Sequence, residues 1–397
     1  MMTLADFVDI NPRTQLPKGN DVPFVGMDAI TAGRRKVVAH ERRAAGGSGA
    51  KFQPRDTLFA RITPCLENGK IAQYLGEEAG FGSTEFYVLR AKPNVSDPDF
   101  VYYFSLQQEL RSAAEKSMTG ASGRQRADVS SLIGFECEFP PLPIQQRIAG
   151  ILLAYDELIE NSQRRIKSLE QMVRNLYREW FVHFRFPNHA KTTMVDSPLG
   201  KIPKGWEVVA FTDIADVLSG GTPKTEVAEY WNGEIPFFTP RDAPACFYVL
   251  DTEKHVTEKG LSKCASEHYL PDTVFITARG TVGKVALPSV PMAMNQSCYA
   301  LRGKPNIPQR FLFLMTLQQI DYLKTNVGGA TFDTIIVDTF RRMRVVNPST
   351  DLVTAFSRCT DAVFEQVNTL QRKIQNLRKT RDLLLPRLLS GQVNLKE

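Results

Sequence analysis

Two long stretches of the chain repeat apolar residues at alternating steps of four and three positions. This spacing brings one side chain per turn to the same face of an α-helix and is typical of a coiled-coil seam. The first stretch carries Tyr155, Ile159, Ser162, Ile166, Leu169, Val173, Leu176 and Trp180. The second carries Val363, Val367, Leu370, Ile374, Leu377, Arg381 and Leu384. Each predicts a helix with a nearly continuous apolar seam, which is interrupted by a polar residue at Ser162 in the first and at Arg381 in the second.

Each predicted helix is too long to be packed inside an ordinary domain, because roughly 40 residues extend about 60 Å. Pro386 should end or kink the second helix. Two matching seams in one chain favour pairing with each other, so we expect an intramolecular coiled coil. Two alternatives stay open: each helix packs on its own domain, or the chain dimerises through the seams.

The segments that precede the two long helices repeat the same order of signals, so the chain contains an internal repeat of about half its length. The paired segments are Phe7-Val8-Asp9-Ile10 with Phe211-Thr212-Asp213-Ile214, Asp56-Thr57-Leu58-Phe59 with Asp272-Thr273-Val274-Phe275, Gly69-Lys70-Ile71 with Gly283-Lys284-Val285, and Phe86-Tyr87-Val88-Leu89-Arg90 with Cys298-Tyr299-Ala300-Leu301-Arg302. Within each half, an aromatic stretch that resembles a helix follows the last of these segments, at residues 100–108 and 311–319.

The repeat predicts two globular parts, which we call heads, of class α+β, because short β-branched and aromatic runs alternate with Gly, Pro and a few helical pieces. A pseudo-two-fold relation between the halves would place the two long helices antiparallel, with one head at each end. The expected boundaries are residues 1–142 for the first head, 143–186 for the first long helix, 187–347 for the second head and 348–397 for the second long helix. Pro, Gly and Lys residues between positions 187 and 205 are typical of a connector.

Composition narrows the class of protein only slightly. The chain has 397 residues and a formal charge of +6, which suits a polyanionic partner without requiring one. The six scattered cysteines form no CxxC pair, so we expect reduced thiols. The amino terminus resembles no export signal and no apolar run reaches membrane-spanning length, so we expect a soluble, cytoplasmic protein.

The motifs of common catalytic sites are missing from the sequence. Residues 278–285 approach a phosphate-binding loop but carry Ala278 for the first glycine and Val285 for the hydroxyl residue that would hold magnesium. Neither Asn11-Pro12 nor Asn347-Pro348 continues into the Asn-Pro-Pro-aromatic run expected of an amino-methyltransferase. The five histidines lack HExxH spacing. We therefore expect no catalytic residue, metal site or cofactor in this chain.

Several motifs resemble those of the DNA-recognition, or specificity, subunits of type I restriction-modification systems. They are the segments Gly220 to Thr225, Glu229 to Pro236, Ile202 to Val208, Pro141 to Ile148, Leu176 to Phe181 and Leu384 to Gly391. The resemblance covers essentially the whole chain. One departure is that the second long helix is entered through Asn347-Pro348-Ser349-Thr350-Asp351 rather than a Pro-x-Pro-x-Gln-Gln run, which leaves its start open.

The resemblance implies two target-recognition domains on a rigid spacer, in a complex where this chain contacts double-stranded DNA. Two modification (methyltransferase) subunits would bring S-adenosylmethionine and methylate adenine, and restriction (motor-nuclease) subunits would use ATP with magnesium. Such a chain would read a bipartite target without chemistry of its own. Two other hypotheses remain: a protein-bridging dumb-bell that binds no DNA, and a free-standing modification enzyme with an unfamiliar site.

Residues that read DNA are expected among Lys, Arg, Asn, Gln and hydroxyl side chains in loops of the two heads. In the first head we predict Arg61, Asn68, Lys70, Ser122, Arg124, Gln125 and Arg126. In the second we predict Thr222, Lys224, Arg241, Arg279, Lys284, Asn295 and Gln296. The cluster Arg34-Arg35-Lys36 with Arg42-Arg43 is a secondary candidate for steering phosphates.

Overall fold

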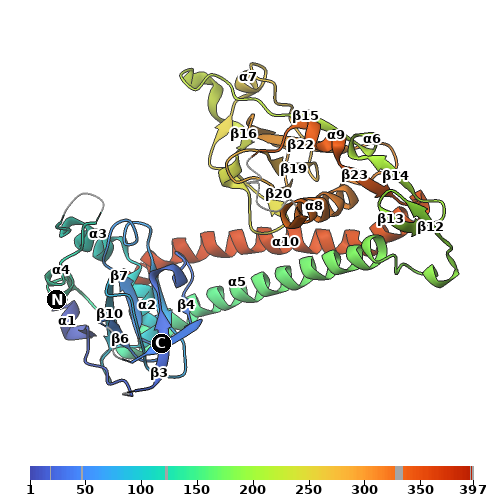
Figure 1. Ribbon diagram of the computed structural model, residues 1–397. Coiled ribbons are helices and arrows are strands. Elements are labelled where there is room, and N and C mark those ends of the chain that lie inside the picture. Colours follow the sequence, from blue (N-terminus) through green and yellow to red (C-terminus); the bar gives the residue numbers. More distant parts are fainter. Residues whose placement is uncertain (18, 46–47, 121–123, 327–333, 394, 396–397) are drawn as a thin grey trace. The chain divides into compact units, whose positions relative to one another are not determined.

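The chain is built from two compact units, seen in a computed structural model that describes residues 1–17, 19–45, 48–120, 124–326, 334–393 and 395 (Figure 1). Unit 1 comprises Met1–Glu160 and Asn376–Glu397, and unit 2 comprises Asn161–Gln375. The two longest helices, α5 (Leu142–Tyr177) and α10 (Thr350–Leu389), each contribute residues to both units.

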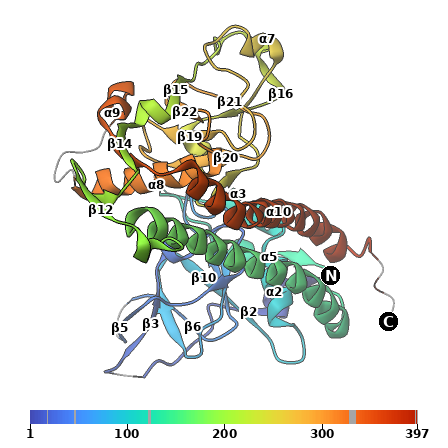
Figure 2. The ribbon, with the colours of Figure 1, turned by 90° about the vertical axis from the view of Figure 1, so that its right-hand side faces the viewer.

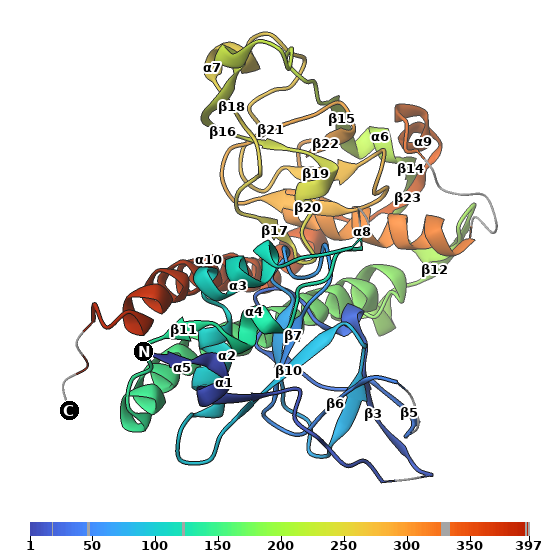
Figure 3. The ribbon, with the colours of Figure 1, turned by 90° about the vertical axis from the view of Figure 1, so that its left-hand side faces the viewer.

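Unit 1 contains a five-stranded sheet, a four-stranded sheet and a short two-stranded one next to a group of helices (Figure 3). The five-stranded sheet has the order β2-β10-β7-β8-β4, with β2 at Val8–Ile10, β4 at Lys36–Val37, β7 at Thr57–Ala60, β8 at Ile71–Tyr74 and β10 at Phe86–Ala91. The four-stranded sheet has the order β5-β3-β9-β6, with β3 at Asp21–Val25, β5 at Glu41–Ala44, β6 at Ala50–Phe52 and β9 at Gly80–Gly82. A short pair joins β1 (Met2–Thr3) to β11 (Glu136–Cys137). The helices are α1 (Leu4–Phe7), the 3₁₀ turn η1 (Met27–Ala29), α2 (Pro98–Ser105), α3 (Gln108–Lys116) and α4 (Ser130–Ile133).

Unit 2 repeats this plan. Its five-stranded sheet has the order β15-β22-β19-β20-β17, with β15 at Ala215–Ser219, β17 at Tyr248–Val249, β19 at Val274–Thr277, β20 at Val285–Pro288 and β22 at Cys298–Gly303. A three-stranded sheet joins β18 (His255–Val256), β16 (Trp231–Phe238) and β21 (Ala293–Met294), and a two-stranded pair joins β14 (Glu207–Ala210) to β23 (Arg344–Asn347). Its shorter helical pieces are η2 (Arg178–Val182), η3 (His189–Lys191), α6 (Phe211–Ile214), η4 (Ala228–Tyr230), η5 (Pro240–Asp242), α7 (Glu258–Leu261) and α9 (Val337–Arg342).

The internal repeat predicted from the sequence is present in the topology. In unit 1, β3 pairs antiparallel with β5 and parallel with β9, and in unit 2, β16 makes the same two kinds of pair with β18 and β21. Parallel pairs recur at corresponding edges, β4 with β8 and β17 with β20. The two halves therefore share one α+β fold.

The sequence alignment of the central strands was wrong by one residue. Leu58 lies opposite Val88 and Ala72, whereas Phe275 lies opposite Ala300 and Ala286. These partners make Leu58 the counterpart of Phe275 rather than of Val274. The positions before the strands agree, because Arg55 and Asp272 both have positive φ, 71° and 64°.

A helix packs on three corresponding strands of the five-stranded sheet in each unit. In unit 1, α2 packs on β7, β8 and β10. In unit 2, α8 (Gln309–Asn326) packs on β19, β20 and β22 (Figure 2). Both helices lie where the aromatic stretches predicted them.

The end of α10 completes the core of unit 1. Leu388 is 3% exposed and belongs to the same apolar cluster as Ile148 and Leu152 of α5. The helix continues through Pro386 to Leu389, so this proline does not end the helix, and the alternative that it kinks the helix stays a prediction. Helix α10 begins at Thr350, separated by two residues from the end of β23 at Asn347. The sequence had left the start of this second long helix open.

The predicted seam residues are divided evenly between buried and half-buried positions. The buried ones are Ile159, Ile166, Val173, Val367, Leu370 and Ile374, and the half-buried ones are Tyr155, Leu169, Leu176, Val363, Leu377 and Leu384. The apparent interruption at Arg381 is an ion pair, because its Nη1 lies 2.5 Å from Oδ1 of buried Asp156. The hydroxyl of Tyr103 in α2 donates to the other Asp156 oxygen at 2.6 Å.

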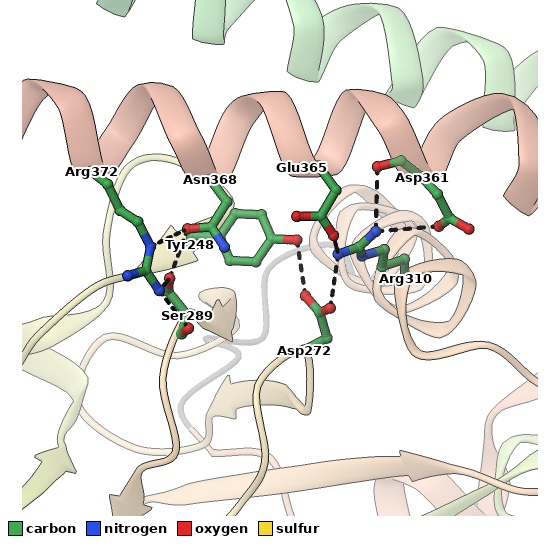
Figure 4. Close-up of polar contacts among 8 residues, drawn as sticks. All are labelled: Tyr248, Asp272, Ser289, Arg310, Asp361, Glu365, Asn368 and Arg372. Carbon is green, nitrogen blue, oxygen red and sulfur yellow. Dashed lines mark hydrogen bonds and ion pairs between the residues drawn. The ribbon is translucent and has the colours of Figure 1, made fainter.

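In unit 2, α10 docks on the head through a row of polar contacts (Figure 4). Arg372 donates to the carbonyl and hydroxyl of Ser289, at 2.9 and 2.7 Å, and the Ser289 hydroxyl donates to Asn368 at 2.7 Å. One helical turn or more along α10, Asp361 and Glu365 pair with Arg310 of α8.

The segment predicted as a connector contains structure of its own. It forms a β-hairpin of β12 (Met194–Ser197) and β13 (Gly200–Pro203). Trp206, which follows the hairpin, stacks on Phe186 with ring centroids 5.5 Å apart. The sequence indicated the turn residues of this segment but not their pairing.

Candidate nucleic-acid interface

A tight turn of the same geometry stands at the same place in both heads. It joins β9 to β10 through Ser83-Thr84-Glu85 and β21 to β22 through Asn295-Gln296-Ser297. The backbone N–H of Glu85 donates to Ser83 Oγ at 3.2 Å, and that of Ser297 donates to Asn295 Oδ1 at 3.0 Å. A side chain at the first position therefore closes the turn in each case.

Neighbouring loops are tied to this turn by equivalent backbone bonds. In unit 1 the N–H of Arg61 donates to the carbonyl of Glu85 at 3.0 Å. In unit 2 the N–H of Ala278 donates to the carbonyl of Ser297 at 2.8 Å. The loop after the central strand thus lies beside the turn in both heads.

The predicted Gly220-Gly221-Thr222 motif lies against the turn of unit 2. The N–H of Gly221 donates to the carbonyl of Met294 at 3.0 Å. A Cβ atom on Gly220 would lie 2.1 Å from the carbonyl oxygen of Asn295, so only glycine fits there. The approach brings Thr222 within hydrogen-bonding contact of Gln296, whose Oε1 accepts from the threonine hydroxyl.

The seven residues predicted in the second head lie in loops that border this turn. Arg279 and Lys284 lie in the β19–β20 loop, and the N–H of Arg279 donates to the Ser297 carbonyl at 3.3 Å. Arg241 lies in η5 after β16, whose Phe238 carbonyl accepts from the N–H of Asn295 at 3.0 Å. Exposed side chains are those of Thr222, Lys224, Arg241, Arg279, Lys284 and Gln296, whereas Asn295 is half-buried.

In the first head, two predicted arginines converge on a carboxylate that the sequence analysis did not select. Arg126 donates from Nε and Nη2 to Glu85 at 3.0 and 2.7 Å, and Arg61 donates from Nε at 3.2 Å. The hydrogen bonds from Arg126, together with the charges of both arginines, hold the pKa of Glu85 below its ordinary value. Glu85 is therefore ionised between two guanidinium groups.

The remaining predicted residues of the first head differ in what they contact. Lys70 is half-buried, and its ammonium group donates to the Met27 carbonyl at 2.8 Å. This contact stabilises the fold of the first head. Asn68 is exposed in the loop between β7 and β8, and Arg124 is exposed in the segment between α3 and α4. Gln125 is half-buried, and its carbonyl accepts from Thr63 N–H at 2.9 Å. Ser122 lies outside the described residues.

The secondary basic cluster is largely neutralised by local partners. Arg35 pairs with Asp99 at 3.3 Å, and Arg42 with Glu78 at 2.8 Å. Arg43 pairs with Glu41 at 2.8 Å. A patch whose charges are paired in this way is a weak attractor of phosphate, so the geometry does not favour this candidate.

The turn Ser83-Thr84-Glu85 is the site that sequence reasoning missed. The signal was present, since matching Tyr87 with Tyr299 aligns these three residues with Asn295-Gln296-Ser297. The sequence alone gives no reason to select Glu85, because an acidic residue is not expected to face a polyanion and its partner Arg126 is distant in sequence.

Features of other site classes are few. Among the residues that the structure describes, no three or more His, Cys, Asp or Glu side chains gather in a way that would hold a metal ion. Within the same ranges, no helix combines the length and apolar content needed to cross a membrane. All six cysteines lie within the described residues, and none of them forms a disulfide.

Comparison with known proteins identifies a family. The family described as "Type I restriction modification DNA specificity domain" matches residues 1–171 and 203–352, which is most of the chain and one match per half.

Individual relatives agree with this match. The chain is 24% identical to the specificity subunit of the type I restriction enzyme HindI of Haemophilus influenzae, over 90% of each chain. It is 32% identical to that of MjaIX of Methanocaldococcus jannaschii, over 43% of this chain and 39% of the other. The crystal structure of a type I restriction-modification S subunit from M. genitalium has a similar fold, with a TM-score of 0.59 at 16% identity, over 98% of this chain and 95% of that one.

Proposed function

We propose that this chain, which belongs to the family of type I restriction modification DNA specificity domains, reads a bipartite DNA target and docks methyltransferase subunits. The observation that carries the proposal is the repeated turn. Each head presents the same turn with hydrogen-bonding side chains beside it, and exposed Arg, Lys, Gln and Thr side chains surround it in the second head. These side chains contact phosphates and base edges in known complexes.

The two heads would read separate half-sites. We assign the first head to residues 1–142 and the second to residues 187–347, with residues 143–186 and 348–397 as the spacer. Different side chains stand at equivalent positions of the shared turn, so the two half-sites should differ in sequence. The target would then be asymmetric, with an unread gap between its halves.

The spacer would be an antiparallel coiled coil of α5 and α10. Two contacts support this pairing. Asp156 of α5 pairs with Arg381 near the end of α10, whereas Tyr177 at the end of α5 packs on Phe356 near the start of α10, with centroids 6.0 Å apart. Residue numbers therefore rise along one helix as they fall along the other. Heptad seams and a polar pair of this kind are the features that specify register in coiled coils.

Methyltransferase subunits would dock on helix surfaces that the heads leave open. Leu158 and Met172 of α5 are 43% and 51% exposed, and Leu383 of α10 is 64% exposed. Large apolar side chains exposed on long helices suit a protein partner. S-adenosylmethionine, ATP and magnesium would then enter with the modification and motor-nuclease subunits, and this chain would contribute recognition without catalysis.

Selection from random DNA tests this proposal. The full chain is incubated with a pool of random duplexes at several salt concentrations, and the bound fraction is sequenced. We expect enrichment of two short specific stretches separated by a constant unread gap, with affinity that falls as salt rises. Binding that is absent, or independent of salt and sequence, would favour the protein-bridging alternative. Methyl transfer by the chain alone would favour the modification enzyme.

A further inference from the structure

Glu85 occupies the centre of a small network in the first head. Glu85 is the third residue of the shared turn, and its side chain is 18% exposed. The Glu85 carboxylate accepts hydrogen bonds from Nε and Nη2 of Arg126 and from Nε of Arg61. One negative charge thus meets two positive charges, and the network keeps a net charge of +1.

The two arginines are also held by the backbone and by an aromatic ring. Arg126 forms an isolated β-bridge with Ile62, which fixes its main chain beside the residue that follows Arg61 in the loop after β7. The Arg61 guanidinium lies 5.4 Å from the centroid of the Tyr87 ring, and the Tyr87 hydroxyl donates to the Ala127 carbonyl at 2.5 Å. The Arg61 guanidinium therefore contacts both Glu85 and the Tyr87 ring, and the Arg126 guanidinium contacts both Glu85 and the Arg124 carbonyl, which accepts from Nη1 at 3.5 Å.

The restrained groups keep unused donors. A guanidinium has five N–H donors, and Glu85 takes one from Arg61 and two from Arg126. The Arg126 and Arg61 side chains are 46% and 31% exposed. An exposed guanidinium fork held in one orientation matches the O6 and N7 acceptors of guanine in the major groove.

We propose that Glu85 is a positioning residue that orients Arg61 and Arg126 to read guanine in the half-site of the first head. This inference rests on the proposed function, and it adds a base class and a residue to it. Holding the two side chains in advance lowers the entropy that binding would otherwise cost. It also leaves the net positive charge that attracts DNA.

The second head is built differently at the same place. Ser297 stands where the first head has Glu85, and the neighbouring side chains are the Asn295 and Gln296 amides and the Thr222 hydroxyl. Glu85 therefore supports guanine reading by one head only. Replacing Glu85 with serine gives the first head the residue of the second.

The experiment repeats the selection from random duplexes with the full-length Glu85→Ser chain. We expect the parent motif to contain guanine in one half-site, and we expect Glu85→Ser to lower the preference for that guanine roughly tenfold while the other half-site stays unchanged. The control is Glu78→Ser, which removes the carboxylate of another Arg–Glu pair of the same head, that of Arg42. It should leave both half-sites as in the parent.

A second variant keeps the test decisive if Glu85→Ser folds poorly. Arg126→Lys preserves the charge but replaces the fork with a point charge, so guanine preference should fall while the salt dependence of binding is retained. The inference is overturned if the parent motif lacks guanine in both halves, or if a folded Glu85→Ser or Arg126→Lys chain keeps the parent preference. A parent that selects no motif overturns the proposed function and this inference with it, whereas a parent motif that the variants leave intact overturns the inference alone.

Discussion

The Arg310 guanidinium of α8 lies 3.0 Å from the Asp272 carboxylate, which ends the turn before the central strand of unit 2. Unit 1 has an ion pair at the same point of the repeat, with the charges exchanged. There Asp99 of α2 lies 2.7 Å from Arg55 of the corresponding turn. The repeat thus preserves an ion pair between helix and turn while reversing its polarity, so the helix of one head has the wrong charge for the turn of the other.

Arg310→Ala should destabilise unit 2. The substitution leaves Asp272, Asp361 and Glu365 without their common partner. The Arg310 side chain is only 15% exposed, so we expect a loss of about 2–3 kcal/mol, somewhat below that for a fully buried pair. All three tryptophans, Trp180, Trp206 and Trp231, lie in unit 2, so urea unfolding followed by tryptophan fluorescence measures this unit.

The matched control for Arg310 is Arg302→Ala. It removes an exposed pair with Glu267 in the same unit and should cost less than about 1 kcal/mol. Equal effects of the two substitutions would show that the Arg310 network does not anchor α8 and α10.

Leu370→Asp should destabilise unit 2 by about 3–5 kcal/mol, because it buries an unpaired charge where the leucine is 7% exposed. Met172→Asp, at a position of α5 that is 51% exposed, should change stability by no more than about 0.5 kcal/mol. Tryptophan fluorescence during urea unfolding compares both variants with the parent. A Leu370→Asp chain as stable as the parent would contradict the burial of this seam position.

Glu170→Gln should stabilise unit 2 in a manner that depends on pH. Burial raises the pKa of Glu170 to about 7, and its Oε1 accepts the N–H of Phe247 at 2.6 Å. The folded chain therefore holds a proton more tightly than the unfolded chain, so the parent loses stability as pH rises from about 4.5 to 7. Glutamine still accepts the hydrogen bond but never ionises.

The Glu170→Gln gain should accordingly be absent near pH 4.5 and should reach about 2–3 kcal/mol above pH 7. Urea unfolding at pH 5 and pH 8 measures it. A gain of the same size at both pH values would contradict ionisation of a buried Glu170.

Substitutions in the loops of the second head should separate phosphate contacts from base contacts. Arg279→Ala and Lys284→Ala should each weaken all duplexes similarly and reduce the salt slope of log K by about 1. Gln296→Ala should instead relax the preference at one base pair, at a cost of about 1–3 kcal/mol, with the slope unchanged. Fluorescence anisotropy with the selected duplex and a scrambled one, at several salt concentrations, distinguishes these outcomes. A Gln296→Ala chain that weakens both duplexes alike would contradict base reading by this amide.

The features that sequence predicted well are those with a local periodic signal. The apolar steps of four and three predicted both long helices, and the shared Tyr-Leu-Arg pattern located β10 and β22. Two other features were missed. Arg381 looked like a breach in its seam, because its partner Asp156 lies on another helix far away in the sequence. Matching Asp56 with Asp272 shifted the strand alignment, because the positive-φ residue of unit 1 is Arg55, one position earlier.

The sequence predicted which types of residue would contact DNA, but it did not predict how these residues are arranged in space. Periodicity carries no information on which loops meet, so Lys70 was selected although it binds the Met27 carbonyl. Glu85 was omitted although it holds two selected arginines. The paired glycines were a more informative signal for the site. Gly220 and Gly221 lie where another backbone segment approaches too closely for a Cβ atom.

The closure of the unit 1 core by Leu388 has a consequence for biosynthesis. Unit 2 is one continuous stretch, Asn161–Gln375, whereas unit 1 combines the first 160 residues with Asn376–Glu397. During vectorial synthesis, every residue of unit 2 therefore leaves the ribosome before the last piece of unit 1 does. Unit 1, whose first residues are made first, is therefore the last unit to be complete. Until Leu388 has been made, Ile148 and Leu152 lack this leucine as a partner in their apolar cluster.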